Sequence, residues 1–378
     1  SAASDVYKRQ VKAYVKENYE KERFGKSNDD LVNTQLNVLM IFSYMQPIMN
    51  IILNLSVVAV IKVGGIQVAN GSVTPGNVMA AITYVTQSLN AVMRMTNMFQ
   101  TASRGIASGR RINEVLACEP SIKDGSFNAT TSIKGKIEFK NVTFAYPLTG
   151  DKKILDNINL VIKPGETIGI LGETGCGKTS LINLIPRFYD VCEGSVLVDD
   201  IDVREYNLKN LRERISVALQ KSEIFQSTIK ENIQWGRENA TDNDIANAAS
   251  IAQAMEFIST STDGFDTLVT QQGTSLSGGQ KQRIAISRTI LKQSEIIIFD
   301  DATSALDLKT EASLYSMLKN AYPDTTKIII AQRIASVKDA DRIVILDDGH
   351  ISAVGTHEEL LKNSAIYQDI YNSQLNKN

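Results

Sequence analysis

The feature that most constrains this sequence is a long stretch with almost no charge. Residues 31–103 contain only two charged side chains, Lys62 and Arg94, whereas the charged fraction of the whole chain, 22%, would place about sixteen there. Two segments of this stretch, residues 39–61 and 78–102, are predominantly apolar and long enough to cross a bilayer. We therefore expect two membrane helices, with a pair of buried helices in a soluble protein as the alternative.

Positive charges flank the apolar stretch on both sides. The connection between its two segments, residues 64–77, is rich in glycine and ends with Pro75-Gly76, which predicts a turn. Lysine and arginine are enriched at the cytoplasmic ends of membrane helices. We expect both ends of this hairpin in the cytoplasm, in a multi-pass protein of the plasma (inner) membrane. Residues 11–38 are expected to form a cytosolic helical stem before the first membrane helix.

Composition excludes some other classes. Forty basic and forty-two acidic side chains give a net charge of −2, which provides no overall attraction for nucleic acid. The three cysteines, Cys118, Cys176 and Cys192, are too few and too scattered for a disulfide framework, and none has metal-ligand spacing with a histidine. We expect no nucleic-acid partner and a reduced, cytosolic setting for most of the chain.

A change of pattern divides the chain. Residues 119–136 are largely polar and contain Pro120 and Gly125, so we expect a linker there. In residues 137–378, short apolar runs alternate with helical patterns. This alternation predicts an α/β domain with a mainly parallel sheet between layers of helices. Residues 1–118 are expected to form a separate, all-helical portion.

The clearest motif is a complete phosphate loop that follows a short apolar run at residues 167–171 and precedes a helix. In such a loop, backbone amides point at the phosphates beside a helix N-terminus. Lys178 is expected to reach the β- and γ-phosphates, and the Thr179 hydroxyl to ligate Mg²⁺. The expected nucleotide-binding residues of this segment are Gly172, Glu173, Thr174, Gly175, Cys176, Gly177, Lys178, Thr179 and Ser180. Cys176 is either a reactive thiol or, as we favour, a small space-filling residue.

Two further segments complete the candidate site. An apolar strand at residues 295–299 ends in Asp300, which we expect to hold Mg²⁺ through water. The segment Leu-Ser-Gly-Gly-Gln at residues 276–280 precedes a basic helix, and it offers a second anion-binding surface. One chain does not need two such surfaces for one nucleotide, so we expect the second to face a nucleotide on another subunit. Its nucleotide-binding residues would be Ser277, Gly278, Gly279 and Gln280.

The order and spacing of the phosphate loop, Gln220, residues 276–280 and Asp300 resemble an ATP-binding cassette (ABC) ATPase over residues 137–361. The resemblance implies a P-loop NTPase fold with an antiparallel β-subdomain and a helical subdomain, and ATP and Mg²⁺ as cofactors.

Further residue roles follow from the resemblance alone. Tyr146 matches the aromatic residue that stacks on adenine. Gln220 matches a glutamine that contacts Mg²⁺ and relays the nucleotide state to the membrane domain. Residues 304–307 match the loop that crosses between paired ATPase domains.

The first third of the chain resembles the exporter branch of the same family. Residues 11–28 are similar to the cytosolic stem before the penultimate membrane helix, and residues 110–116 to the end of the last one. Exporter halves of this branch have more membrane helices than this chain can contain. Residues 1–118 are therefore expected to be a partial transmembrane domain, and the chain to be the carboxyl-terminal part of such a half-transporter.

Two positions depart from the family pattern. Active members have a glutamate general base where this chain has Asp301, and a histidine where it has Gln332. Aspartate is one methylene shorter, and glutamine cannot carry an imidazolium charge. With Gln220, these residues form the expected catalytic set, and we expect weak hydrolysis at this site. The hypothesis that follows is a heterodimer, in which a different half-transporter supplies the glutamate.

Alternatives stay open at this point. Neutral drift in an active homodimeric exporter with slow ATPase would explain the same two positions, as would a soluble or regulatory ABC ATPase. The transported substrate cannot be derived. Polar positions in the apolar segments, such as Asn50, Asn54, Gln87 and Arg94, indicate only a partly hydrated path among membrane lipids.

Overall fold

The computed structural model describes residues 2–129, 134–147, 152–270, 273 and 275–375. The chain divides into two compact units, Ser1–Glu119 and Pro120–Asn378. This boundary lies at the start of the expected linker, of which residues 130–133 are outside the described part of the chain.

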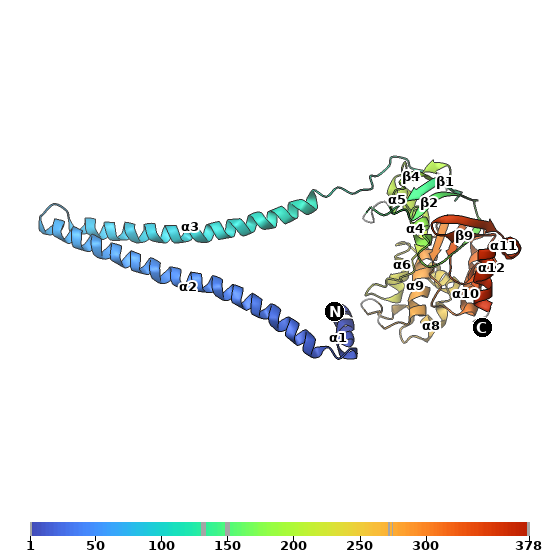
Figure 1. Cartoon of the computed structure of the whole chain (residues 1–378), viewed down its shortest axis with the longest axis horizontal. Coiled ribbons are helices and arrows are strands. Elements are labelled where there is room, and N and C mark those ends of the chain that lie inside the picture. The colour runs from blue at the N-terminus through green and yellow to red at the C-terminus, as the bar shows by residue number, and fades with distance from the viewer. Residues whose placement is uncertain (1, 130–133, 148–151, 271–272, 274, 376–378) are drawn as a thin grey trace. The chain divides into compact units, whose positions relative to one another are not determined.

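The first unit is entirely helical in its described residues, with helices α1 (Ala2–Ala13), α2 (Glu17–Ala69) and α3 (Pro75–Leu116). Helices α2 and α3 contact each other and form a long hairpin (Figure 1). At this contact Gly64 lies against Val78, and a Cβ atom at Gly64 would be 2.8 Å from Val78 Cγ2. The glycine therefore allows the two helices to approach closely.

The structure corrects two helix boundaries, the start of the stem and the extent of the turn. The stem was expected from residue 11, but the chain breaks between α1 and α2, where Val15 has a φ of 50°. The stem and the first apolar segment form one continuous helix, α2, which contains Pro47 in its interior. The expected turn at residues 64–77 is reduced to the residues between Ala69 and Pro75. Glycine weakens a helix without ending it, and Pro75 occupies the first turn of α3, where proline is tolerated.

Among the described residues, only α2 is long and apolar enough to cross a membrane by length and composition. Its apolar side chains are exposed, for example Leu39, Ile41 and Leu55. Helix α3 does not meet the same criterion, so the membrane helix expected at residues 78–102 stays a prediction.

The second unit contains two sheets (Figure 1). The four-stranded sheet has the order β2-β1-β4-β5, and its pairs are antiparallel. The six-stranded sheet has the order β10-β9-β3-β8-β7-β6 and is parallel apart from the pair β9–β10. The strands are β1 (Ile137–Phe144), β2 (Leu155–Ile162), β3 (Thr167–Leu171), β4 (Glu193–Val198), β5 (Ile201–Asp202), β6 (Ile215–Ala218), β7 (Ile296–Asp300), β8 (Thr326–Ile330), β9 (Arg342–Asp347) and β10 (His350–Gly355).

The six-stranded sheet separates two hydrophobic cores. In β7, Ile297 and Phe299 face the core formed with the helices, whereas Ile296 and Ile298 face the core shared with the four-stranded sheet. All five residues of β7 are buried. Burial on both faces explains why these strands are continuous apolar runs and not alternating ones. The expected mainly parallel sheet with an antiparallel β-subdomain is confirmed.

The helices of this unit are short or of medium length, and most begin with a side-chain cap. Asp307, for example, caps α10 through the Thr310 amide, and Thr356 caps α11 through the Glu359 amide. The helices are α4 (Lys178–Asn183), α5 (Leu208–Glu213), α6 (Ile229–Gln234), α7 (Asp242–Ile251), α8 (Met255–Thr260), α9 (Gly278–Leu291), α10 (Leu308–Ala321), α11 (His357–Asn363) and α12 (Ala365–Leu375), with 3₁₀-helices η1 (Gly264–Asp266) and η3 (Ile334–Ser336).

Candidate functional site

The parallel sheet brings the predicted residues together at one edge. The phosphate loop follows β3, Asp300 is the last residue of β7, and Gln220 and Gln332 each lie two residues beyond the ends of β6 and β8. Because the strands are parallel, their carboxyl ends meet at the same edge of the sheet. Side chains that are far apart in the sequence therefore converge there.

A cavity of about 270 Å³ lies at this edge. It contains ten of the positions proposed from the sequence in the phosphate loop and its partners, together with Tyr146. Two further residues, Ile154 and Ile330, line it without having been predicted. Its lining consists of Tyr146, Ile154, Thr174, Gly175, Gly177, Lys178, Thr179, Ser180, Gln220, Asp300, Asp301, Ile330 and Gln332.

Glycines give the phosphate loop its shape. Gly175 and Gly177 have φ angles of 92° and 104°, which favour glycine strongly. A Cβ atom at Gly177 would also lie 2.9 Å from Leu155 Cδ2. The Lys178 ammonium donates hydrogen bonds of 2.7 Å to the carbonyl oxygens of Gly172 and Glu173. The lysine is thus held across the loop, with its charge where phosphate oxygens would bind.

Three predicted residues of the loop, Gly172, Glu173 and Cys176, lie outside the lining. Glu173 takes part through its carbonyl oxygen, which accepts from Lys178. Cys176 is buried, and its Sγ lies 3.7 Å from Lys178 Nζ. A Cβ atom at Gly172 would lie 2.7 Å from this sulfur. The burial of Cys176 favours the space-filling interpretation over a reactive thiol.

The candidate Mg²⁺ ligands are in contact. Thr179 Oγ1 donates a 3.0 Å hydrogen bond to Asp300 Oδ1. Burial raises the pKa of Asp300, the Thr179 hydrogen bond opposes this rise, and the negative charge of Asp301 adds to it. A hydroxyl and a carboxylate beside a phosphate site are the oxygen donors that Mg²⁺ prefers. These two residues therefore fit the ion, and a bound cation would stabilise the ionised form of Asp300.

Asp301 contacts the side chains that follow two other strands, Gln220 after β6 and Gln332 after β8. Its Oδ2 accepts hydrogen bonds from Gln332 Nε2 at 2.8 Å and from Gln220 Nε2 at 3.2 Å. Burial raises the pKa of Asp301, while the two glutamines and the positive charges of Lys178 and Arg333 act against the rise. The residue has a φ of 48°, an uncommon backbone geometry for a non-glycine residue. Its carboxylate is therefore anchored by both glutamines in the lining of the cavity.

Tyr146 lies at the rim of the cavity beside the phosphate loop. Its hydroxyl is 2.9 Å from Ser180 Oγ. Its ring packs edge-on against Phe144 and Tyr189, with centroid separations of 4.9 and 5.0 Å. These neighbours fix the orientation of the ring, which suits a residue that stacks on a flat base.

The residues 277–280 lie outside this cavity. Ser277 caps α9: its hydroxyl accepts from the Gln280 amide at 3.3 Å, and the Gln280 side chain accepts from the Ser277 amide at 2.9 Å. Gly279 lies beside Ala305, where a Cβ atom would be 3.0 Å from the carbonyl oxygen. This surface does not meet the phosphate loop of its own chain.

Sequence reasoning missed Gln282. This buried side chain donates to Ser304 Oγ at 3.1 Å and accepts from the Ala305 amide at 2.9 Å. Ser304 in turn donates to the carbonyl oxygen of Asp301 at 2.9 Å. Gln282 thus links α9 to the segment that follows Asp301. The signal in the sequence was a polar residue among the apolar positions of a helix.

Comparisons with known proteins agree with this geometry. The family model described as ABC transporter matches residues 155–304, and the one described as ABC transporter transmembrane region matches residues 8–92. An ATP-dependent lipid A-core flippase of Desulfotalea psychrophila is 40% identical over 96% of this chain and 63% of its own length. The uncharacterized ABC transporter ATP-binding protein YfiB of Bacillus subtilis is 38% identical over 97% of this chain and 63% of its own length.

A solved structure extends the likeness to three dimensions. The structure of a bacterial Atm1-family ABC exporter with ATP bound matches with a TM-score of 0.89 and 28% identity, over 99% of this chain and 66% of that chain. The chain spans 63% of the length of the two curated relatives named above. The two family matches and these relatives show that the chain belongs to the ABC transporter family, of the exporter type that joins a membrane-embedded region to a cytoplasmic ATP-binding domain.

Proposed function

We propose that this chain binds Mg²⁺-ATP and couples its hydrolysis to export across the plasma (inner) membrane. The observation that carries the proposal is the convergence of Lys178, Thr179, Asp300, Asp301 and Gln220 on one cavity at the carboxyl edge of a parallel sheet. The relatives named above support the transport half of the proposal, because they combine the same two regions.

Each group in the cavity has a distinct role in this proposal. Lys178 neutralises phosphate charge, and the backbone of the loop holds the phosphates in place. Thr179 and Asp300 hold Mg²⁺, which when bound neutralises the charge that develops on the phosphates. Asp301 accepts the proton of the attacking water, and Gln332 and Gln220 hold its carboxylate in position.

We further propose that the functional site forms between two chains. Residues 277–280 lie outside the cavity of their own chain, although their helix N-terminus suits an anion. A second half-transporter would bring its own such surface to this cavity. Asp301 and Gln332, in place of glutamate and histidine, favour a partner of different sequence that supplies the stronger base. A homodimer with slow turnover is the competing arrangement.

The experiment is an ATPase assay of the full chain in lipid nanodiscs, alone and with a candidate half-transporter encoded beside it. We expect ATP binding by the chain alone and rapid turnover only with the partner. Lys178→Met is the control that removes binding. Rapid turnover by the chain alone would refute the heterodimer and favour the homodimer, whereas failure to bind ATP in both preparations would refute the proposed function itself.

The proposed substrate class is a membrane lipid. This rests on the name of the Desulfotalea psychrophila relative, a lipid A-core flippase, and on the exposed apolar side chains of α2. A lipid substrate is expected to raise the ATPase rate of the assembled transporter in a dose-dependent way. Stimulation by water-soluble peptides, with no response to any lipid, would contradict this class.

A further inference from the structure

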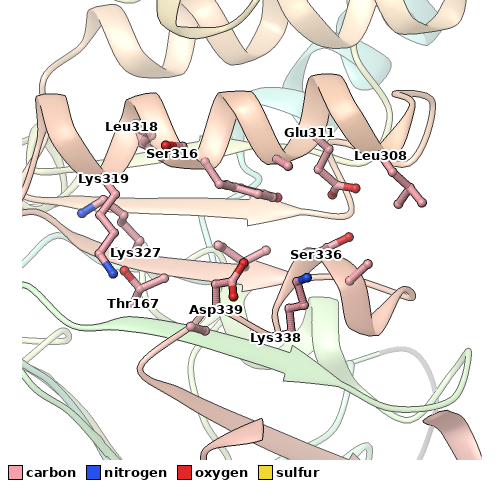
Figure 2. Close-up of a pocket in the computed structure, with 15 residues that line it drawn as sticks. Thr167, Leu308, Glu311, Ser316, Leu318, Lys319, Lys327, Ser336, Lys338 and Asp339 are labelled. Carbon is pink, nitrogen blue, oxygen red and sulfur yellow. The ribbon is translucent and has the colours of Figure 1, made fainter.

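A second, larger cavity lies in the ATP-binding unit and has no part in the proposed function. Its volume is about 460 Å³, and none of its lining residues lines the nucleotide cavity. It lies between helix α10, strand β8 and the segment that runs from η3 to residue 340 (Figure 2). Its size is within the range of small-molecule sites.

One end of this cavity is cationic. Figure 2 shows the ammonium groups of Lys319, from α10, and Lys327, from β8, at the same end beside Thr167. Lys327 is only 3% exposed, and its ammonium donates to the carbonyl oxygens of Tyr322 at 2.6 Å and Thr325 at 2.8 Å. These two bonds leave one of its three protons available.

The carboxylates of Asp341 and Asp324 act on Lys327 only through their charge and form no ion pair with it. In the described part of the chain, neither Lys319 nor Lys327 forms an ion pair. Burial lowers the pKa of Lys327 to about 8, the charge of Asp341 opposes this, and the charge of Lys319 adds to it. Asp341 itself accepts a hydrogen bond from the Thr167 amide at 2.8 Å. Two cations close together, neither of them in an ion pair, are stabilised when an anion binds between them.

The remainder of the cavity restricts what that anion can be. Buried Leu318 and Ile329 contribute apolar surface, which suits a hydrocarbon or aromatic body. Figure 2 also shows the carboxylates of Asp339 and Glu311 further along the cavity. Lys338 also lines this part, so the two carboxylates leave it with a net negative charge. That charge disfavours a ligand with several negative charges, such as a nucleotide.

We propose that this cavity binds a small amphipathic monoanion, with a carboxylate between Lys319 and Lys327 and an apolar body along Leu318 and Ile329. The site is separate from the nucleotide cavity, so ATP does not compete for it. A phenylalkanoate has the required combination of a flat apolar body and a single carboxylate.

The test is calorimetric titration of the full chain in lipid nanodiscs with 4-phenylbutanoate, 4-phenylbutanol and 4-phenylbutylamine. We expect the carboxylate to bind about tenfold more tightly than the alcohol, because a hydrogen bond to a charged group contributes roughly this factor. The amine is expected not to bind, and ATP not to displace the carboxylate. Equal binding of carboxylate and alcohol, or displacement by ATP, would overturn the proposal.

Three variants locate the site. Lys319→Met changes an exposed side chain, and it is expected to weaken carboxylate binding about tenfold. Lys309→Met is the matched control, because Lys309 is exposed on the same helix but does not line the cavity. Ala312→Phe is expected to fill the cavity and abolish binding. Wild-type affinity in both Lys319→Met and Ala312→Phe would show that the ligand binds elsewhere.

Discussion

Replacement of Gln282 by methionine tests whether α9 controls the segment that follows Asp301, the proposed general base. The change keeps the length of the side chain but removes its hydrogen bonds to Ser304 at 3.1 Å and from the Ala305 amide at 2.9 Å. Ser304 then keeps its two described bonds to the Asp301 carbonyl oxygen, from its hydroxyl at 2.9 Å and from its backbone amide at 3.3 Å. We expect the segment to become less ordered while the contacts to nucleotide stay in place.

The magnitude follows from the two lost bonds. Each hydrogen bond contributes about 1 kcal/mol to the free energy of unfolding. Ala305 is exposed, so water can replace part of the lost hydrogen bonding at its amide. The expected loss is therefore about 1 to 2 kcal/mol. In a domain of this size, such a loss lowers Tm by roughly 3 to 6 °C. Gln282→Ala removes packing as well and is expected to lower Tm further.

Two measurements on the full chain in nanodiscs decide the outcome. Thermal unfolding gives Tm, and ATPase assays with the partner give kcat and KM. We expect kcat to fall in Gln282→Met while ATP affinity changes little. A lower Tm with unchanged kcat would show that Gln282 only stabilises the fold, and an unchanged Tm and kcat would refute the reasoning altogether.

Other predictions concern the cavity itself. Asp301→Glu combined with Gln332→His is expected to raise the turnover of the chain alone by roughly 10²-fold, the lower estimate for a general base; an unchanged rate with intact ATP binding would contradict this. Burial raises the pKa of Asp301 in the folded state. As the pH rises above the pKa of the unfolded state, the ionised carboxylate therefore increasingly destabilises the folded chain. Asp301→Asn should therefore raise Tm more at pH 7.5 than at pH 5, and an equal gain at both would refute this. Lys178→Met is expected to abolish ATP binding in an equilibrium titration. It is not expected to lower Tm, since the two hydrogen bonds that it removes are made to carbonyl oxygens of the loop itself.

Much of the architecture was predictable because its signals are local. The phosphate loop is defined by residue types at short spacing, and the buried strands are continuous β-branched runs such as that of β7. The boundaries of the helices in the first unit were less predictable. Gly64 and Gly65 predicted a turn, but they lie inside α2, where Gly64 allows close contact with Val78. Only the packed hairpin shows that these glycines belong to a helix contact.

The sequence alone therefore determined which residues could bind ATP and Mg²⁺, because motif order carries that information. The tertiary structure decided how they act together. Gln220 and Asp301 are 81 positions apart, and Gln332 is 31 positions from Asp301, yet both glutamines donate to the same carboxylate oxygen. The partners of Gln282 and the cationic end formed by Lys319 and Lys327 likewise could not be derived from the sequence. Each depends on side chains from separate elements that meet only when the sheet and its helices pack.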